Sequence, residues 1–62
     1  MAAEHVRVLS AAHAVLVAKR RSIATALSQS YSDQACDQFA IVQNSIDAIE
    51  RAILQEQKEI SQ

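Results

Sequence analysis

Residues 35–60 read ACDQFAIVQNSIDAIERAILQEQKEI, and this stretch decides the fold. Seven of its apolar residues recur at alternating steps of four and three, with only Glu56 breaking the series, which places them on one narrow face of an α-helix. This spacing is that of the a and d positions of a heptad repeat, along which helices pack in coiled coils. The series comprises Ala35, Phe39, Val42, Ile46, Ile49, Ile53 and Ile60. We therefore predict a helix over about 33–60 that packs against another helix along this seam.

A broader apolar pattern occupies the first half of the chain. Leu9, Leu16 and Ile23 lie seven residues apart and form its central row. Valines and alanines on both sides of this row widen the apolar face well beyond the roughly 100° that one neighbouring helix covers. We predict a helix over about 3–29 that contacts more than one neighbour.

The two patterns are separated by the polar segment Ser28-Gln29-Ser30-Tyr31-Ser32-Asp33, which predicts a turn over about 29–33. A short polar connection between two helices makes them antiparallel neighbours. Either Ser30 or Ser32 can cap the N-terminus of the second helix. The sequence thus predicts an all-α fold, in which residues 1–62 form a single antiparallel two-helix hairpin.

Folding about this turn sets the predicted register. Large apolar residues of the two helices then meet in layers, such as Ile23 against Phe39 and Leu16 against Ile46. The same register brings His13 to the level of Glu50, and we predict a contact between them. The predicted hairpin core comprises Leu9, Leu16, Ile23, Leu27, Phe39, Val42, Ile46, Ile49, Ile53 and Ile60.

A chain of this size and composition needs a partner. It has 62 residues, half of them hydrophobic, no glycine or proline and a single cysteine. Such a composition is typical of helical bundles. Natural chains this short rely on disulfides, a metal or another subunit, and one cysteine excludes an internal disulfide.

Apolar residues outside the seam indicate where that partner binds. Two copies of the hairpin, packed as a four-helix bundle, would cover many of them. We expect the partner to be a second copy, giving a homodimer, with a heterologous helical protein as the alternative. The sequence leaves open whether two or four chains assemble. The predicted interface comprises Val8, Val15, Val17, Ile41, Ala48 and Leu54.

The two halves of the chain differ in charge. Residues 1–31 carry four basic residues and one acidic residue, a net +3, whereas residues 32–62 carry two basic and six acidic residues, a net −4. Opposite charges favour antiparallel pairing of the halves, and the total of −1 gives no general attraction to nucleic acid or membranes. The candidate contacts for an anionic partner are Arg7, Lys19, Arg20 and Arg21.

No motif for catalysis or for a cofactor is found. His5 and His13 lie eight residues apart, about 12 Å along a helix, which is too far to share a metal. The acidic pairs at helical spacing are typical of solvated faces, and Cys36 has no basic neighbour that would activate it. We expect a non-enzymatic protein without cofactor or metal. With no segment long enough to span a membrane and no export signal, we expect it in the cytoplasm.

The pattern as a whole resembles the Rop family of plasmid copy-number regulators. Length, mid-chain turn and heptad hairpin are similar, and Asp33-Gln34-Ala35-Cys36 resembles that family's turn region. The resemblance implies an antiparallel dimer of hairpins that binds RNA loop pairs through its first helices. The lysines and aromatic residue that the family uses for RNA are missing, so its RNA-binding activity cannot be carried over to this chain. RNA binding through the basic residues of the first helix is a further alternative.

Two shorter stretches resemble other helical proteins. Ala48-Ile49-Glu50-Arg51-Ala52-Ile53 would suit the second helix of the small hairpin co-chaperones of type III secretion systems. Those proteins hold a needle subunit together with a larger chaperone, which implies an adaptor as the alternative function. Residues 45–51 also resemble the opening helix of chorismate mutases, but the active-site basic residues of those enzymes have no counterpart here.

Overall fold

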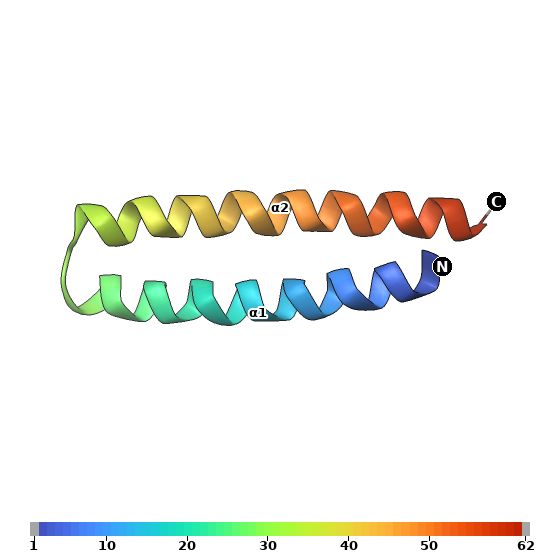
Figure 1. Ribbon diagram of the computed structural model, residues 1–62. Coiled ribbons are helices and arrows are strands. Elements are labelled where there is room, and N and C mark those ends of the chain that lie inside the picture. Colours follow the sequence, from blue (N-terminus) through green and yellow to red (C-terminus); the bar gives the residue numbers. More distant parts are fainter. Residues whose placement is uncertain (1, 62) are drawn as a thin grey trace.

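Two long antiparallel helices lie side by side along their whole length in the computed structural model (Figure 1). The structure describes the backbone of residues 2–61 and the side chains of residues 3–59. Helix α1 spans Ala2–Gln29 and helix α2 spans Asp33–Ser61. The start of α1 and the end of α2 lie at the end of the hairpin opposite the turn (Figure 1). The predicted all-helical architecture with two packed helices is confirmed.

A serine organises the turn between the helices. The backbone N–H of Ala35 donates to the hydroxyl oxygen of Ser32 at 3.3 Å, and that of Cys36 donates to the carbonyl oxygen of Ser32 at 3.0 Å. Of the two predicted caps, Ser32 is therefore the one used. On the other side of the turn, the N–H of Ser30 donates to the carbonyl oxygen of Ala26 at 3.0 Å. None of the described residues has a positive φ, which explains how the turn forms without glycine.

The core is a thin layer of side chains between the two helices. Among the described residues only Ile23 and Ile46 are fully buried hydrophobic residues, at 5% and 2% exposure. The side chain of Ile60 lies outside the described residues. The other predicted core residues are partly buried: Leu9, Leu16, Leu27, Phe39, Val42, Ile49 and Ile53.

Helix α1 packs with two rows of residues, and one of them was not predicted as a row. Beside Leu9, Leu16 and Ile23 runs a second series at seven-residue spacing, and all of its members are partly buried. Its two central members are polar, so an apolar pattern alone does not reveal it. The series comprises Val6, His13, Arg20 and Leu27.

The hairpin is long and thin. Its principal extents are 48 × 14 × 12 Å and its radius of gyration is 14.4 Å. A compact domain of 62 residues has a radius of gyration of about 10.6 Å. Most side chains therefore lie near the surface. Within the described residues, neither helix has a stretch long and apolar enough to cross a membrane.

Candidate functional site

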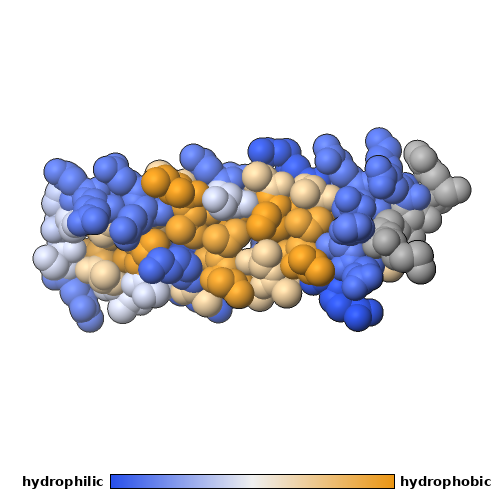
Figure 2. Space-filling view, in the orientation of Figure 1, coloured by the Kyte–Doolittle hydropathy of each residue, from blue (hydrophilic) through white to orange (hydrophobic). Residues whose placement is uncertain are grey.

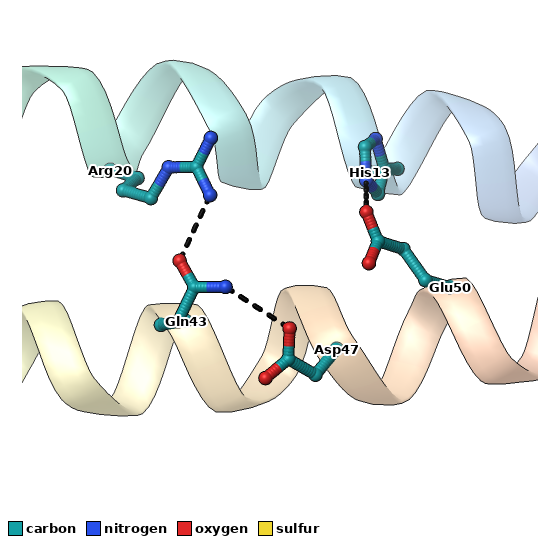
Figure 3. Close-up of polar contacts among 5 residues, drawn as sticks. All are labelled: His13, Arg20, Gln43, Asp47 and Glu50. Atoms are coloured by element: carbon teal, nitrogen blue, oxygen red, sulfur yellow. Dashed lines mark hydrogen bonds and ion pairs between the residues drawn. The ribbon is translucent and has the colours of Figure 1, made fainter.

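Polar contacts join the two helices on one face of the hairpin (Figure 3). The Nε2 atom of His13 lies 3.0 Å from the Oε2 atom of Glu50, which confirms the predicted contact. The side chains are 30% and 55% exposed, so water screens this pair and its contribution to stability is small.

A second polar contact lies one heptad nearer the turn. The Nη1 atom of Arg20 donates to the Oε1 atom of Gln43 at 2.9 Å, and the Nε2 atom of Gln43 donates to the Oδ1 atom of Asp47 at 3.0 Å. The amide of Gln43 thus links the guanidinium of α1 to a carboxylate of α2 (Figure 3). Sequence reasoning missed Gln43. The available signal was the predicted register. It places Gln43 opposite Arg20 in the same way as it places Glu50 opposite His13, one heptad further from the turn.

A shallow groove lies beside the histidine contact. Its volume is about 440 Å³, and it is lined by Ser10, His13, Glu50, Ile53 and Leu54. Four of these five residues are exposed or polar, so the groove is open to water. Leu54, predicted as an interface residue, is 66% exposed at its edge.

Most of the predicted interface residues are exposed in the isolated hairpin. Val8 is 61% exposed, Val15 69% and Ile41 64%, and Ala48 is exposed as well. Val17 differs, because it is partly buried within the hairpin. Figure 2 shows a nearly continuous hydrophobic band along the middle of one face, with hydrophilic side chains toward both ends.

Helical geometry separates the exposed apolar residues of α1 from its polar contacts. At 100° per residue, Val15 is turned about 100° one way from Leu16, whereas Arg20 is turned about 40° the other way. Val8 and Val15 are seven residues apart and share one side of the helix, as His13 and Arg20 share the other.

Helix α2 shows the same division. Ile41 is turned about 140° one way from the buried Ile46, whereas Gln43 and Leu54 are turned about 60° and 80° the other way. Figure 3 draws α1 above α2 with Gln43 left of Glu50, so it views the hairpin from the side opposite to Figures 1 and 2.

The hairpin therefore has two unlike faces. We call the one that carries Val8, Val15, Ile41 and Ala48 the apolar face, and the one with the His13–Glu50 and Arg20–Gln43–Asp47 contacts the polar face. Leu54 lies on the polar face. The predicted interface residues thus divide between two faces rather than forming one surface.

The four basic residues do not form one surface. Arg20 is partly buried and directed toward Gln43. Lys19 and Arg21 are exposed but lie about 160° apart around the helix. Arg7 is also exposed, and it is separated from Arg21 by 14 residues, about 21 Å along α1. The structure does not bring these residues together as the phosphate-binding cluster of an RNA reader requires.

The turn carries a tyrosine whose pKa is raised. The hydroxyl of Tyr31 donates to the Oδ1 atom of Asp33, and this hydrogen bond raises the pKa of the tyrosine above its ordinary value of 10.0. The nearby Cys36, once ionised, raises it further. Tyr31 is 75% exposed and Cys36 is a free, exposed thiol. No group of three histidine, cysteine or acidic side chains within residues 3–59 is placed to hold a metal ion.

Comparisons with known proteins identify no family for this chain. No protein-family model matches it, and no curated protein or solved structure does so either. The likenesses drawn from the sequence are therefore likenesses of pattern, and the two faces of the hairpin carry the functional argument.

Proposed function

We propose that this protein is a non-enzymatic helical interaction module that pairs with a second copy of itself. In this proposal two hairpins pack through their apolar faces, in the manner of coiled coils, and form a homodimeric four-helix bundle. The single observation that carries the proposal is the amount of surface that one hairpin leaves exposed.

The exposed surface exceeds that of an ordinary monomer. The hairpin has 4681 Å² of accessible surface, whereas a folded monomer of its mass, 6.8 kDa, has about 3,950 Å². The excess of about 700 Å² is close to the roughly 800 Å² that each partner buries in a standard protein interface. One partner on one face would therefore give this chain the burial of a normal small protein.

The composition of the apolar face supports a protein partner. Val8, Val15 and Ile41 each expose more than half of their surface, and they lie on both helices of one face. Contiguous exposed aliphatic side chains rimmed by polar residues mark interaction surfaces. Among the described residues only Ile23 and Ile46 are buried hydrophobic side chains. Covering Val8, Val15 and Ile41 would therefore add substantially to the apolar burial of the chain.

Sedimentation equilibrium over a wide concentration range tests the proposal, with helix content followed by circular dichroism on the same samples. We expect a folded dimer that persists to low micromolar concentration. Val15→Glu should shift the mass toward the monomer, because it places a charge in the apolar face. Ala14→Glu is the matched control, since Ala14 is exposed and its side chain is turned about 100° away from that of Val15.

Two results would contradict the proposal. One is a helical monomer at all concentrations, and the other is a chain that stays monomeric and loses helix on dilution. The second result would leave the apolar face to a heterologous helical protein, as in an adaptor or co-chaperone. Equal effects of the two glutamate variants would show that the apolar face is not the site of self-association.

A further inference from the structure

The proposed homodimer can form in two orientations, because a two-fold axis can bring two apolar faces together in two ways. If the axis runs across the hairpin, α1 lies over the partner's α1 and the turns are at opposite ends. If it runs along the hairpin, α1 lies over the partner's α2 and both turns are at the same end. The choice between them rests on the proposed self-association and depends on which side chains line the apolar face.

The exposed apolar side chains are spread evenly about the middle of this face. The register of the polar contacts puts Val15 level with Ala48. Val8 lies seven residues from Val15 toward the termini, about 10 Å along the helix. Ile41 lies the same distance from Ala48 toward the turn. Both orientations can centre on this level and cover these four residues, so apolar burial does not select one of them.

The charged side chains of the apolar face are placed unevenly along it. At 100° per residue, four of the described charged side chains are turned toward this face: Glu4 and Lys19 of α1, and Glu56 and Glu59 of α2. The three glutamates all lie toward the chain termini, about 12–17 Å from the level of Val15. Lys19 lies about 6 Å from that level on the side of the turn. One end of the apolar face is therefore acidic, and the other half carries the basic side chain.

Packing with both turns at the same end would superpose the two acidic ends. Glu4 is level with Glu59 in the register of the hairpin, so each Glu4 would face the partner's Glu59 across the interface. Six carboxylates would gather at one end, and each Lys19 would lie about 18 Å or more from the partner's glutamates along the bundle. Like charges that face each other oppose association.

Packing with the turns at opposite ends separates the acidic ends instead. The two groups of glutamates then lie about 24 Å or more apart along the bundle, well beyond the Debye length of about 8 Å at physiological salt. Each Lys19 lies only about 6–10 Å along the bundle from the partner's glutamates. Unlike charges at such a spacing favour association.

We propose that the two copies pack with their turns at opposite ends, with α1 over the partner's α1 and α2 over the partner's α2. Each acidic end then covers the half of the partner's apolar face that carries Lys19. Val15 faces the partner's Val15 near the two-fold axis.

The protein's only cysteine reports on this orientation. Cys36 is exposed and is turned about 80° from Ile46 toward the polar face, so a nitroxide spin label attached to it stays clear of the apolar face. It lies 12 residues from Ala48, about 18 Å along α2. With the turns at opposite ends, the axial offset between two labels is about 36 Å and their separation is about 40 Å. With the turns together, only the width of the bundle separates them, about 20–25 Å.

Pulsed electron spin resonance on the labelled dimer measures this separation, and we expect about 40 Å. Sedimentation first shows that the labelled chain dimerises as the unlabelled chain does. A sample diluted with unlabelled chain shows that the distance is between chains.

Two variants at one position test the role of charge. Lys19→Gln and Lys19→Glu place side chains of almost equal size at the apolar face and differ mainly in charge. Lys19→Glu adds a carboxylate near the partner's glutamates, so its dissociation constant should exceed that of Lys19→Gln about threefold or more at about 0.05 M salt. The difference should shrink at about 0.5 M salt, where the Debye length is about threefold shorter. Arg21→Gln and Arg21→Glu are the matched control pair, because Arg21 is exposed and turned about 160° from Lys19 on the same helix.

The outcomes separate this orientation from the proposed function. A separation of about 20–25 Å overturns the orientation while the homodimer stands. Equal dissociation constants for the two Lys19 variants overturn the role of charge in selecting it. A chain that sediments as a monomer overturns both the orientation and the homodimer. A separation near 40 Å, together with a weaker dimer for Lys19→Glu than for Lys19→Gln, supports the arrangement with the turns at opposite ends.

Discussion

Replacing Ile46 by alanine tests the core most directly, because this side chain is only 2% exposed. The change removes three carbon atoms, worth about 2.4 kcal/mol at about 0.8 kcal/mol per buried CH₂ group. A cavity left in so thin a core adds to this, and such changes cost about 2–5 kcal/mol in general. The free energy of unfolding of 62 residues is about 3–9 kcal/mol. We expect a loss of about 3 kcal/mol, a third or more of the total.

Urea unfolding followed by circular dichroism measures this loss. With a slope of about 1 kcal/mol per M for so small a chain, the midpoint should fall by about 3 M. Ile41→Ala is the matched control, since it makes the same chemical change on the same helix at a side chain that is 64% exposed. At the lowest usable protein concentration its midpoint should change little. Equal shifts of the urea midpoint for the two variants at this protein concentration would refute the assignment of Ile46 to the core.

The remaining predictions concern polar groups. Ultraviolet titration should show Tyr31 ionising above its ordinary pKa of 10.0. Asp33→Asn should lower the pKa of Tyr31, because the tyrosine hydroxyl then has no carboxylate to which it can donate a hydrogen bond. Because the pKa of Tyr31 is raised in the folded state, its hydrogen bond stabilises the fold at pH values below the ordinary pKa. This stabilisation is lost as pH rises through the pKa of Tyr31 in the folded state. Titration of the wild-type tyrosine at its ordinary pKa would contradict the prediction. Gln43→Ala should destabilise the hairpin by about 1 kcal/mol in urea unfolding, since Arg20 loses its acceptor. Gln55→Ala, at an exposed position, is the control, and an equal effect would show that the contact contributes nothing.

Much of the fold could be predicted because its signals are local. The four-and-three spacing along α2 specifies which side chains face α1, and Ile46 is the most buried of those that the structure describes. The turn has only polar residues between two long periodic segments, which fixes both its place and the antiparallel direction. With direction and turn known, the register follows, and it predicted the contact between His13 and Glu50.

The second row of α1 could not be predicted from apolarity. His13 and Arg20 occupy positions where a heptad normally has aliphatic residues, so a search for apolar spacing passes over them. These polar side chains can lie between the helices because His13 contacts Glu50 and Arg20 contacts Gln43 on the other helix. Such contacts depend on three-dimensional packing, which apolar spacing does not report. The assignment of Leu54 and Val8 to opposite faces was available from helical geometry, and it was missed because these residues were grouped only as lying outside the seam. The homodimer, which depends on contacts between chains, stays a prediction.

The polar contacts favour the apolar face over the polar face as the site of the proposed self-association. Covering the polar face would remove water from His13, Glu50 and Arg20, and the desolvation of charged groups is costly unless every polar atom finds a new partner. The apolar face has a smaller cost of this kind, since helical geometry places Lys19 and Glu56 at its edges, where their charged ends can reach water. A hairpin with two apolar faces could stack indefinitely, because each added copy would offer a fresh face. With one face apolar and the other polar, two copies in the proposed dimer would cover each other's apolar residues and leave mostly hydrated surface outside, so the proposal predicts a closed assembly rather than a growing stack.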